Sequence, residues 1–340
     1  MLASIYAAAA SARRAYYRAP GRQRRLDRPV ISVGNLRVGG TGKTPAVAHL
    51  AQVLLEMGER PAILSRGYGR RSAAAGVVVV SDGRRLSADL DRSGDEPLML
   101  ARSVDGARVL VSADRYLAGR LAELRLGATV HVLDDGFQHL TLARGTDLLI
   151  VSEEDIADAQ TLPAGRLREP LSAASSADAL LVPSGTNDQA RTVAASLGVG
   201  TAFQLVRVPG EPQRLDLLGA SAPAKPGAPV LAVAGVARPQ RFFDELRTAG
   251  WDVKRTVAFP DHYRYRRTDA AGLADAARSA GARAIVTTEK DLVRLLPFRP
   301  MPLPVMWLPL SVTIHPAPAF RDWLAGRLAA ERARQSEARA

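Results

Sequence analysis

Short apolar runs alternate with longer amphipathic segments along most of the chain, beginning at Pro29. Each run has the length of one buried strand, and the runs read PVISVG, RPAILS, GVVVVS, ARVLVS, ATVHVLDD, TDLLIVS and ALLVPS. Helical patterns such as AVAHLAQVLLEMG stand between them. This alternation predicts an α/β fold, in which crossover helices connect the strands of a parallel sheet.

A stretch rich in proline, alanine and glycine, SAPAKPGAP, divides the chain and predicts a linker. Beyond it, strand-like runs again alternate with amphipathic segments, in the order VLAVAG, PQRFFDELRTAG, VKRTVAF, TDAAGLADAARSAG, RAIVTTEK and PVMWLPL. We therefore expect a larger unit over residues 29–205, a linker over 206–229 and a second, smaller α/β unit over 230–335.

Residues 1–28 predict an N-terminal amphipathic helix with a basic end. Leu2, Ile5, Tyr6 and Ala9 fall on one helical face, and Tyr16 and Tyr17 with seven arginines follow them. Such a helix suits an anionic membrane surface, but an ordinary helix packed on the domain with a solvated basic face fits equally well. The segment is not a signal peptide, because its positive charge follows the apolar run.

Composition narrows the class of protein. The 340 residues favour two domains, and 47% hydrophobic with 24% charged residues excludes wholesale disorder and collagen-like repeats. No apolar run approaches the roughly 18–20 residues of a spanning helix. The chain contains no cysteine, which excludes disulfides, zinc–thiolate sites and cysteine nucleophiles. A net charge of +12 favours an anionic partner: nucleic acid, nucleotide, phospholipid or another phosphorylated molecule.

A glycine-rich string follows the first predicted strand and opens a helix. The backbone N–H groups of such a turn surround a phosphate, its lysine reaches the terminal phosphates, and its threonine hydroxyl binds Mg²⁺. The chain has Arg37 where the consensus has glycine, but the GGTGKT core in this context outweighs that difference. The sequence therefore predicts a P-loop, formed by Arg37, Val38, Gly39, Gly40, Thr41, Gly42, Lys43 and Thr44.

Three classes of P-loop protein fit this sequence poorly: the GTPases, the partition ATPases and the nucleic-acid motors. Thr288-Glu289-Lys290-Asp291 is out of register for a guanine-reading loop, and Val38 replaces the signature lysine of partition ATPases. Aromatic residues make up only 5% of the chain, which argues against a nucleic-acid channel.

The string HVLDDGFQH places two carboxylates where an apolar strand ends. P-loop enzymes hold a carboxylate beside Mg²⁺ at this edge of the sheet, so Asp134 or Asp135 is a candidate for the metal. The alternative is an Asp-Gly turn without a ligand.

Two further segments carry candidates for proton transfer. In Gly94-Asp95-Glu96-Pro97 an acidic side chain could cap the following helix or accept a proton from a substrate hydroxyl. His262, in a loop just after a predicted strand, is either solvated or orients such a carboxylate. The residues alone leave both alternatives open.

Together these segments resemble the tetraacyldisaccharide 4′-kinase family, from about Pro29 to near the end of the chain. The resemblance is carried in order by SVGNLRVGGTGKTP, LSRGYGRR, GDEP, DDGFQH, LPAGRLREP, FPDHYRY and TEKD. It implies a P-loop domain joined to a smaller α/β domain, with the active site between them. It also implies transfer of the γ-phosphate of ATP to the 4′-hydroxyl of a tetraacyldisaccharide 1-phosphate, a step of lipid A biosynthesis. The resemblance further implies that the reaction takes place at the cytoplasmic face of the bacterial inner membrane, where the N-terminal helix helps to hold the enzyme.

The resemblance also implies roles for individual residues. Asp95 matches the catalytic base and His262 its partner, while Lys43, Thr44, Asp134 and Asp135 match the positions for phosphate and Mg²⁺. Further active-site positions are matched by Arg115, Gln138, Arg168 and Glu169. This chain has Tyr263 where many family members carry a second histidine.

Two other classes of protein compete with this interpretation. A membrane-surface P-loop ATPase that switches conformation would modify no small molecule, and Val38 argues against it. A nucleic-acid-stimulated ATPase is suggested by the net charge alone, so no nucleic-acid partner is expected.

Overall fold

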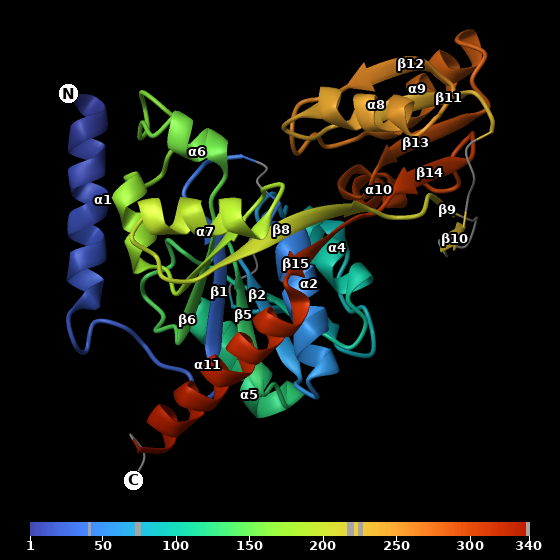
Figure 1. Cartoon of the computed structure of the whole chain (residues 1–340). Helices are drawn as coiled ribbons and strands as arrows, with labels where there is room; N and C mark the ends of the chain where they lie inside the picture. Colours follow the sequence, from blue (N-terminus) through green and yellow to red (C-terminus); the bar gives the residue numbers. More distant parts are fainter. Residues whose placement is uncertain (40–41, 72–75, 216–220, 224–226, 338–340) are drawn as a thin grey trace.

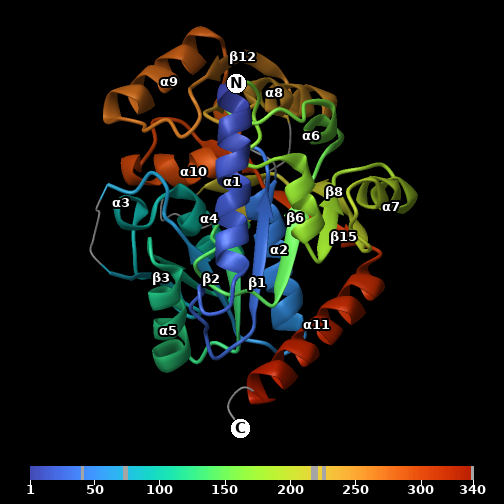
Figure 2. The same cartoon turned by 90° about the vertical axis from the view of Figure 1, so that its left-hand side faces the viewer.

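The computed structural model describes residues 1–39, 42–71, 76–215, 221–223 and 227–337. They form two α/β units with an additional helix beside the larger one (Figures 1 and 2). The described strands of the larger unit form one sheet in the order β15-β8-β7-β6-β1-β5-β2-β4-β3, and those of the smaller unit form a second in the order β10-β9-β14-β13-β11-β12.

The larger sheet is parallel except at its two edges, where β3 and β15 run antiparallel to their neighbours. Its strands are β1 (Val30–Asn35), β2 (Pro61–Ser65), β3 (Val78–Asp82), β4 (Arg108–Val111), β5 (Val130–Asp134), β6 (Thr146–Ile150), β7 (Ala179–Val182), β8 (Ala202–Pro209) and β15 (Leu310–His315). The helices of this unit are α2 (Lys43–Glu56), α3 (Leu90–Ser93), α4 (Asp95–Ser103), α5 (Arg115–Leu126), α6 (Glu153–Ala157), α7 (Asn187–Ser196) and α11 (Ala317–Glu337), with a 3₁₀ turn over Leu171–Ser176.

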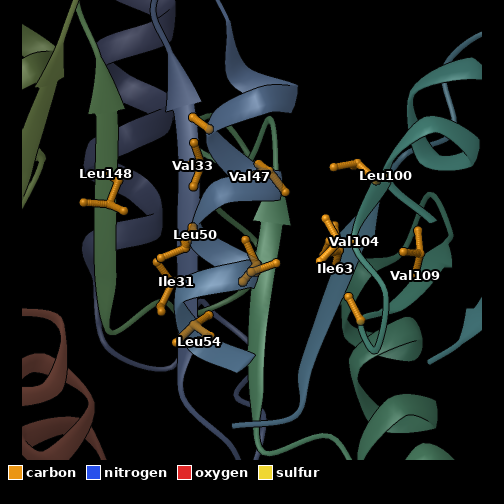
Figure 3. Packing of buried hydrophobic residues seen from close by; sticks show 14 of the residues in the cluster. Ile31, Val33, Val47, Leu50, Leu54, Ile63, Leu100, Val104, Val109 and Leu148 are labelled. Atoms are coloured by element: carbon orange, nitrogen blue, oxygen red, sulfur yellow. The ribbon is translucent and has the colours of Figure 1, made fainter. Parts of the chain in front are cut away.

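The centre of this sheet is covered on both faces, which explains why its strands are apolar throughout. Every residue of β1 is buried. On α2, Val47, Leu50 and Leu54 recur at helical spacing and pack against Ile31 of β1 (Figure 3). Because β1 and α2 pack against each other, they hold in place the P-loop that connects the end of β1 to the start of α2.

The smaller unit is built on the same principle around a second core. Its strands are β9 (Gln213–Leu215), β10 (Ser221–Pro223), β11 (Val230–Ala234), β12 (Val253–Ala258), β13 (Ala284–Thr288) and β14 (Val305–Leu308), and its helices are α8 (Pro239–Thr248), α9 (Arg267–Ser279) and α10 (Glu289–Leu295), followed by a 3₁₀ turn over Leu296–Phe298. The four neighbouring strands β14, β13, β11 and β12 are parallel, and β12 forms one edge of the sheet. The α/β class expected from the sequence is therefore confirmed for both units.

The boundaries expected between the units need correction. β8 continues through Val206 to Pro209, and β9 and β10 belong to the smaller sheet, so residues 206–229 are not simply a linker. β15 pairs with β8 in the larger sheet, and α11 buries Phe320 and Leu324 in the larger core. Residues 310–335 therefore belong with the larger unit. The sequence placed these residues in the smaller unit because they follow it along the chain. The antiparallel pairing of β15 with β8 returns the chain to the larger sheet.

Helix α1 (Leu2–Arg18) lies along one side of the larger unit, with its N-terminus toward the smaller unit (Figures 1 and 2). Leu2 is 66% exposed and Ile5 60%, so the apolar face expected from the sequence is not covered by the rest of the chain. Among the residues of α1, all of which are described, Arg14 is the buried one. Within the described chain, no helix has both the length and the apolar character required to span a bilayer.

Candidate active site

The P-loop begins where β1 ends and closes on the first turn of α2. Gly39 and Gly42 adopt positive φ angles of 104° and 83°, which explains the glycines at these positions. Lys43 Nζ donates to Asn35 Oδ1 at 2.8 Å and lies 3.5 Å from Asp135 Oδ1. Thr44 is buried in the first helical turn. Gly40 and Thr41, also expected in the loop, lie outside the described residues.

The two aspartates after β5 occupy different environments. Asp134 is buried and accepts a hydrogen bond from Ser65 Oγ at 2.9 Å. Burial and then the negative charges of Glu96 and Asp135 raise its pKa to about 7. Burial would also raise the pKa of Asp135, but Lys43 and Arg168 outweigh it and lower that pKa. Asp135 adopts a positive φ of 52°, and its carboxylate contacts both cations.

These residues fit a magnesium ion held together with a nucleotide. The donors are oxygen atoms, which Mg²⁺ prefers, and it usually binds one or two carboxylates plus phosphates. Asp135 Oδ1 is buried and, among the described residues, has only the ion pair with Lys43 at 3.5 Å and no hydrogen bond of normal length. A cation bound beside Asp134 would lower the raised pKa of that carboxyl group. In the part of the chain that the structure describes, no three acidic or histidine side chains form a complete metal cage.

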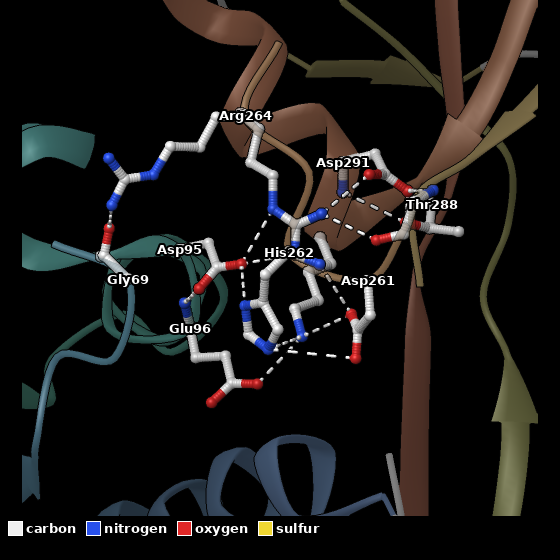
Figure 4. Close-up of polar contacts among 12 residues, drawn as sticks. Gly69, Asp95, Glu96, Asp261, His262, Arg264, Thr288 and Asp291 are labelled. Atoms are coloured by element: carbon white, nitrogen blue, oxygen red, sulfur yellow. Dashed lines mark hydrogen bonds and ion pairs between the residues drawn. The ribbon is translucent and has the colours of Figure 1, made fainter. Parts of the chain in front are cut away.

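The structure brings Asp95 and His262 together across the two units (Figure 4). Asp95 is the first residue of α4, and His262 follows β12 with a positive φ of 58°. His262 Nδ1 lies 3.0 Å from Asp95 Oδ2, and with Asp95 ionised it is this nitrogen that donates. Side-chain exposure is 6% for Asp95 and 27% for His262, so the histidine is the more accessible partner.

Two cations of α10, which the sequence did not identify as part of the site, complete this cluster. Arg294 Nε donates to Asp95 Oδ2 at 2.8 Å. Lys290 Nζ lies 3.1 Å from both Glu96 Oε1 and His262 Nε2. The two residues are four positions apart and thus share one helical face, but only the tertiary structure shows that this face meets α4.

The charges around Asp95 determine its protonation state. Burial alone would raise the pKa of this carboxyl group. The hydrogen bond from His262 and the positive charges of Arg294 and Lys290 outweigh that effect and hold the pKa well below its ordinary value. Asp95 is therefore ionised at neutral pH.

Three of the remaining candidates lie beside the phosphate site. Arg115 is buried at the start of α5, and burial lowers its pKa to about 10 despite the nearby charge of Asp134. Arg168 Nη1 donates to Asp135 Oδ2 at 2.8 Å. Gln138 Nε2 donates to the carbonyl of Asn35 at 3.0 Å, so it links the turn after β5 to the end of β1.

Two other candidates face away from the phosphate site. Glu169 accepts two hydrogen bonds from Arg14 of α1, at 2.7 and 2.8 Å. The Arg37 side chain turns to Glu154 and Asp158, with distances of 3.0 and 3.2 Å. Arg37 thus holds α6 against the P-loop, and the consensus glycine is not required at its position.

A family model described as tetraacyldisaccharide-1-P 4′-kinase matches residues 1–329. A relative from Geobacter sulfurreducens named tetraacyldisaccharide 4′-kinase is 41% identical over 311 residues, which cover 89% of this chain and 85% of its own length. One of the same name from Pelobacter propionicus is 42% identical over 292 residues, covering 81% and 76%. The chain belongs to this family. It is therefore a kinase, and the fold and family that the sequence motifs predicted are confirmed.

A solved structure agrees with this assignment of the kinase. The crystal structure of LpxK from Aquifex aeolicus in complex with ATP matches with a TM-score of 0.74 and 29% sequence identity. The match covers 96% of this chain and 100% of that one.

Proposed function

We propose that this kinase transfers the γ-phosphate of ATP to the 4′-hydroxyl of a tetraacyldisaccharide 1-phosphate, the step of lipid A biosynthesis that gives lipid IVA. The observation that carries the proposal is the joint geometry of Lys43 and the Asp95–His262 pair. Lys43 of the P-loop pairs with Asp135, and His262 of the smaller unit pairs with Asp95 of the larger one. Asp134 connects the two groups, because its pKa responds both to Lys43 and to Glu96, the neighbour of Asp95. That arrangement supplies a phosphate site and a proton acceptor for one acceptor hydroxyl.

The P-loop side holds the nucleotide. Backbone N–H groups at the start of α2 and the Lys43 ammonium bind the β- and γ-phosphates. The Arg115 and Arg168 guanidinium groups lie beside Asp134 and Asp135 and offset negative charge on the transferring phosphoryl group. Thr44, Asp134 and Asp135 would hold Mg²⁺, which supplies charge neutralisation on the β- and γ-phosphates when bound.

Asp95 takes the proton of the 4′-hydroxyl, and His262 orients it. A carboxylate with so low a pKa is a weak base, which suits phosphoryl transfer because the transition state is loose and the hydroxyl proton leaves late. The bond from oxygen to the γ-phosphorus forms as the β–γ bridging bond breaks, so ADP is the leaving group. Lys290, 3.1 Å from His262 Nε2, limits where the imidazole can turn.

The acceptor is delivered from an anionic membrane surface, which we place at the cytoplasmic face of the bacterial inner membrane. Leu2, Ile5 and Tyr6 of α1 are exposed on one face, and Tyr16 is 52% exposed beside the arginine-rich segment over 18–28. Exposed apolar side chains next to cations favour binding to anionic lipid.

The test is transfer of label from γ-³²P-ATP to a tetraacyldisaccharide 1-phosphate in detergent micelles. We expect a labelled bis-phosphate product from the wild-type chain and a loss of at least ~100-fold in kcat with Lys43→Ala, because the lysine compensates charge in the transition state. The variant should keep its melting temperature within a few degrees. A wild-type chain that binds ATP but yields no labelled lipid would overturn the proposal.

A further inference from the structure

Helix α1 is attached to the larger unit in an unusual way. Its buried residue is an arginine, whereas its apolar side chains at Leu2 and Ile5 are exposed. The Arg14 and Glu169 side chains are 8% and 5% exposed, and two parallel hydrogen bonds of 2.7 and 2.8 Å join them. A buried ion pair is stable only when its geometry is good and its remaining donors are satisfied. Hydrophobic burial alone does not explain why α1 docks here.

The remaining contacts of Arg14 are with the turn that carries the carboxylates. Arg14 Nη2 donates to the carbonyl of Phe137 at 3.2 Å, and its guanidinium lies 4.2 Å from the centre of the Phe137 ring. Phe137 is completely buried two residues after Asp135. The preceding residue of the helix, Arg13, donates to the carbonyl of Gln138 at 3.1 Å. Helix α1 therefore holds the turn after β5 at two consecutive carbonyls.

Glu169 connects Arg14 to a second segment of the site. It follows Arg168, whose backbone N–H donates to Leu36 O at 2.6 Å and whose side chain binds Asp135. The two neighbouring side chains point in different directions, one toward the phosphate site and one toward α1. A displacement of Glu169 consequently moves Arg168, which pairs with Asp135.

We infer that Arg14 is a positioning residue for phosphoryl transfer: through it, α1 holds Asp135, Gln138 and Arg168 in register with the P-loop. This inference rests on the proposed function of the site. It makes α1 a structural part of the active site as well as a surface for lipid. The exposed apolar side chains and Arg14 lie on the same helix, so α1 connects the surface that we propose for lipid with the turn that carries Asp135.

The experiment compares Arg14→Met, Arg14→Lys and the exposed control Arg191→Met, whose side chain is 70% exposed in an ion pair on α7. We expect Arg14→Met to lower kcat at least ~10-fold at saturating ATP and lipid, because small displacements of positioned groups cost that much or more. The KM for the lipid should stay within about twofold. Binding to vesicles of phosphatidylglycerol and phosphatidylethanolamine should be unchanged, because the guanidinium is buried. Arg191→Met should match the wild type throughout.

Hydrogen exchange supplies a readout that does not depend on turnover. With Arg14→Met, peptides covering 134–138 and 166–169 should exchange faster, while those covering β11 and β13 keep the wild-type rate. Arg14→Lys keeps the charge beside Glu169 and should fold normally with an intermediate loss of kcat. Wild-type kcat and wild-type exchange in Arg14→Met, or a loss of vesicle binding alone, would overturn the inference. A wild-type chain that makes no labelled lipid would reject the proposed function, and the exchange rates would still decide the role of Arg14.

Discussion

At the scale of single residues, the charges packed around each buried carboxyl group set its pKa. Asp95 receives donors from His262 and Arg294, both on the smaller unit, and remains ionised although it is buried. Asp134 accepts its hydrogen bond from the neutral Ser65 hydroxyl, and burial with the charges of Glu96 and Asp135 raises its pKa to about 7. The two carboxylates thus have opposite properties, one suited to accepting a proton late and one suited to a metal ion.

The depressed pKa of Asp95 makes the free energy of unfolding depend on pH. A carboxyl group whose pKa is lower in the folded state stabilises the fold above its unfolded-state pKa of about 3.9, and this contribution is lost as the pH falls further. We expect Asp95→Asn to lower the free energy of unfolding by about 3 kcal/mol at pH 7, because it leaves Arg294 without one partner. The difference from the wild type should begin to shrink below about pH 4 and should keep shrinking as the pH is lowered further in urea titrations.

The matched control for this experiment is Asp188→Asn. Asp188 is 90% exposed and pairs with Arg191, so its removal should change the free energy of unfolding by less than about 0.5 kcal/mol. An effect of Asp95→Asn that stays constant down to about pH 2 would show that charge on Asp95 is not its cause.

At the scale of elements, β1 and the turn after β5 approach so closely that a side chain has no room between them. A Cβ atom on Gly34 would lie 2.5 Å from Phe137 Cβ and 2.8 Å from the Phe137 nitrogen. The close approach places Asp135 within reach of Lys43. It also lets Gln138 donate to Asn35 O.

We expect Gly34→Ala to lower the free energy of unfolding by about 1–3 kcal/mol, the usual cost of overpacking, and to reduce kcat. The control is Gly326→Ala in α11, where a Cβ meets nothing within 4 Å. That change should be neutral or should stabilise by up to about 1 kcal/mol, since alanine favours helix over glycine. Thermal unfolding and label transfer measure both effects. Wild-type behaviour of Gly34→Ala would mean that β1 and the turn can separate.

At the scale of the whole molecule, the smaller unit is an excursion from the larger sheet. The chain leaves after β8, builds the second sheet and returns as β15, which pairs antiparallel with β8. Helix α11 then completes the core, with Phe320 and Trp323 packed on Phe203 at ring-centre distances of 5.1 and 5.6 Å. The residues at the end of the chain therefore stabilise the unit that its beginning forms.

This topology predicts the result of shortening the chain. A chain that ends at Pro309 keeps every motif of the site but loses β15 and α11. We expect it to unfold without a cooperative transition and to lose ATP binding, because β8 becomes an unpaired edge and Phe203 is uncovered. A chain that ends at Glu337 serves as the control. Cooperative melting and wild-type ATP binding of the shorter chain would contradict the prediction.

The sequence by itself determined the fold class and the family, and it predicted where phosphate would bind. A P-loop is a contiguous strand, turn and helix, so its spacing is visible in one string. Asp134 and Asp135 could be placed beside it because neighbouring parallel strands end at the same edge of a sheet, and β1 does pair with β5. Asp95 and His262 were paired only by the family resemblance, because 167 residues separate them.

The tertiary structure decided what depends on contacts between distant segments. Arg294 reaches Asp95 across 199 positions, and Arg14 reaches Glu169 across 155. The sequence left α1 with two interpretations, and the structure shows an exposed apolar face on a helix anchored by one buried arginine. Periodicity reports which face of an element is apolar, but the partner of a buried charge is set by how the elements pack. For the same reason β15 was assigned to the wrong unit until its pairing with β8 was known.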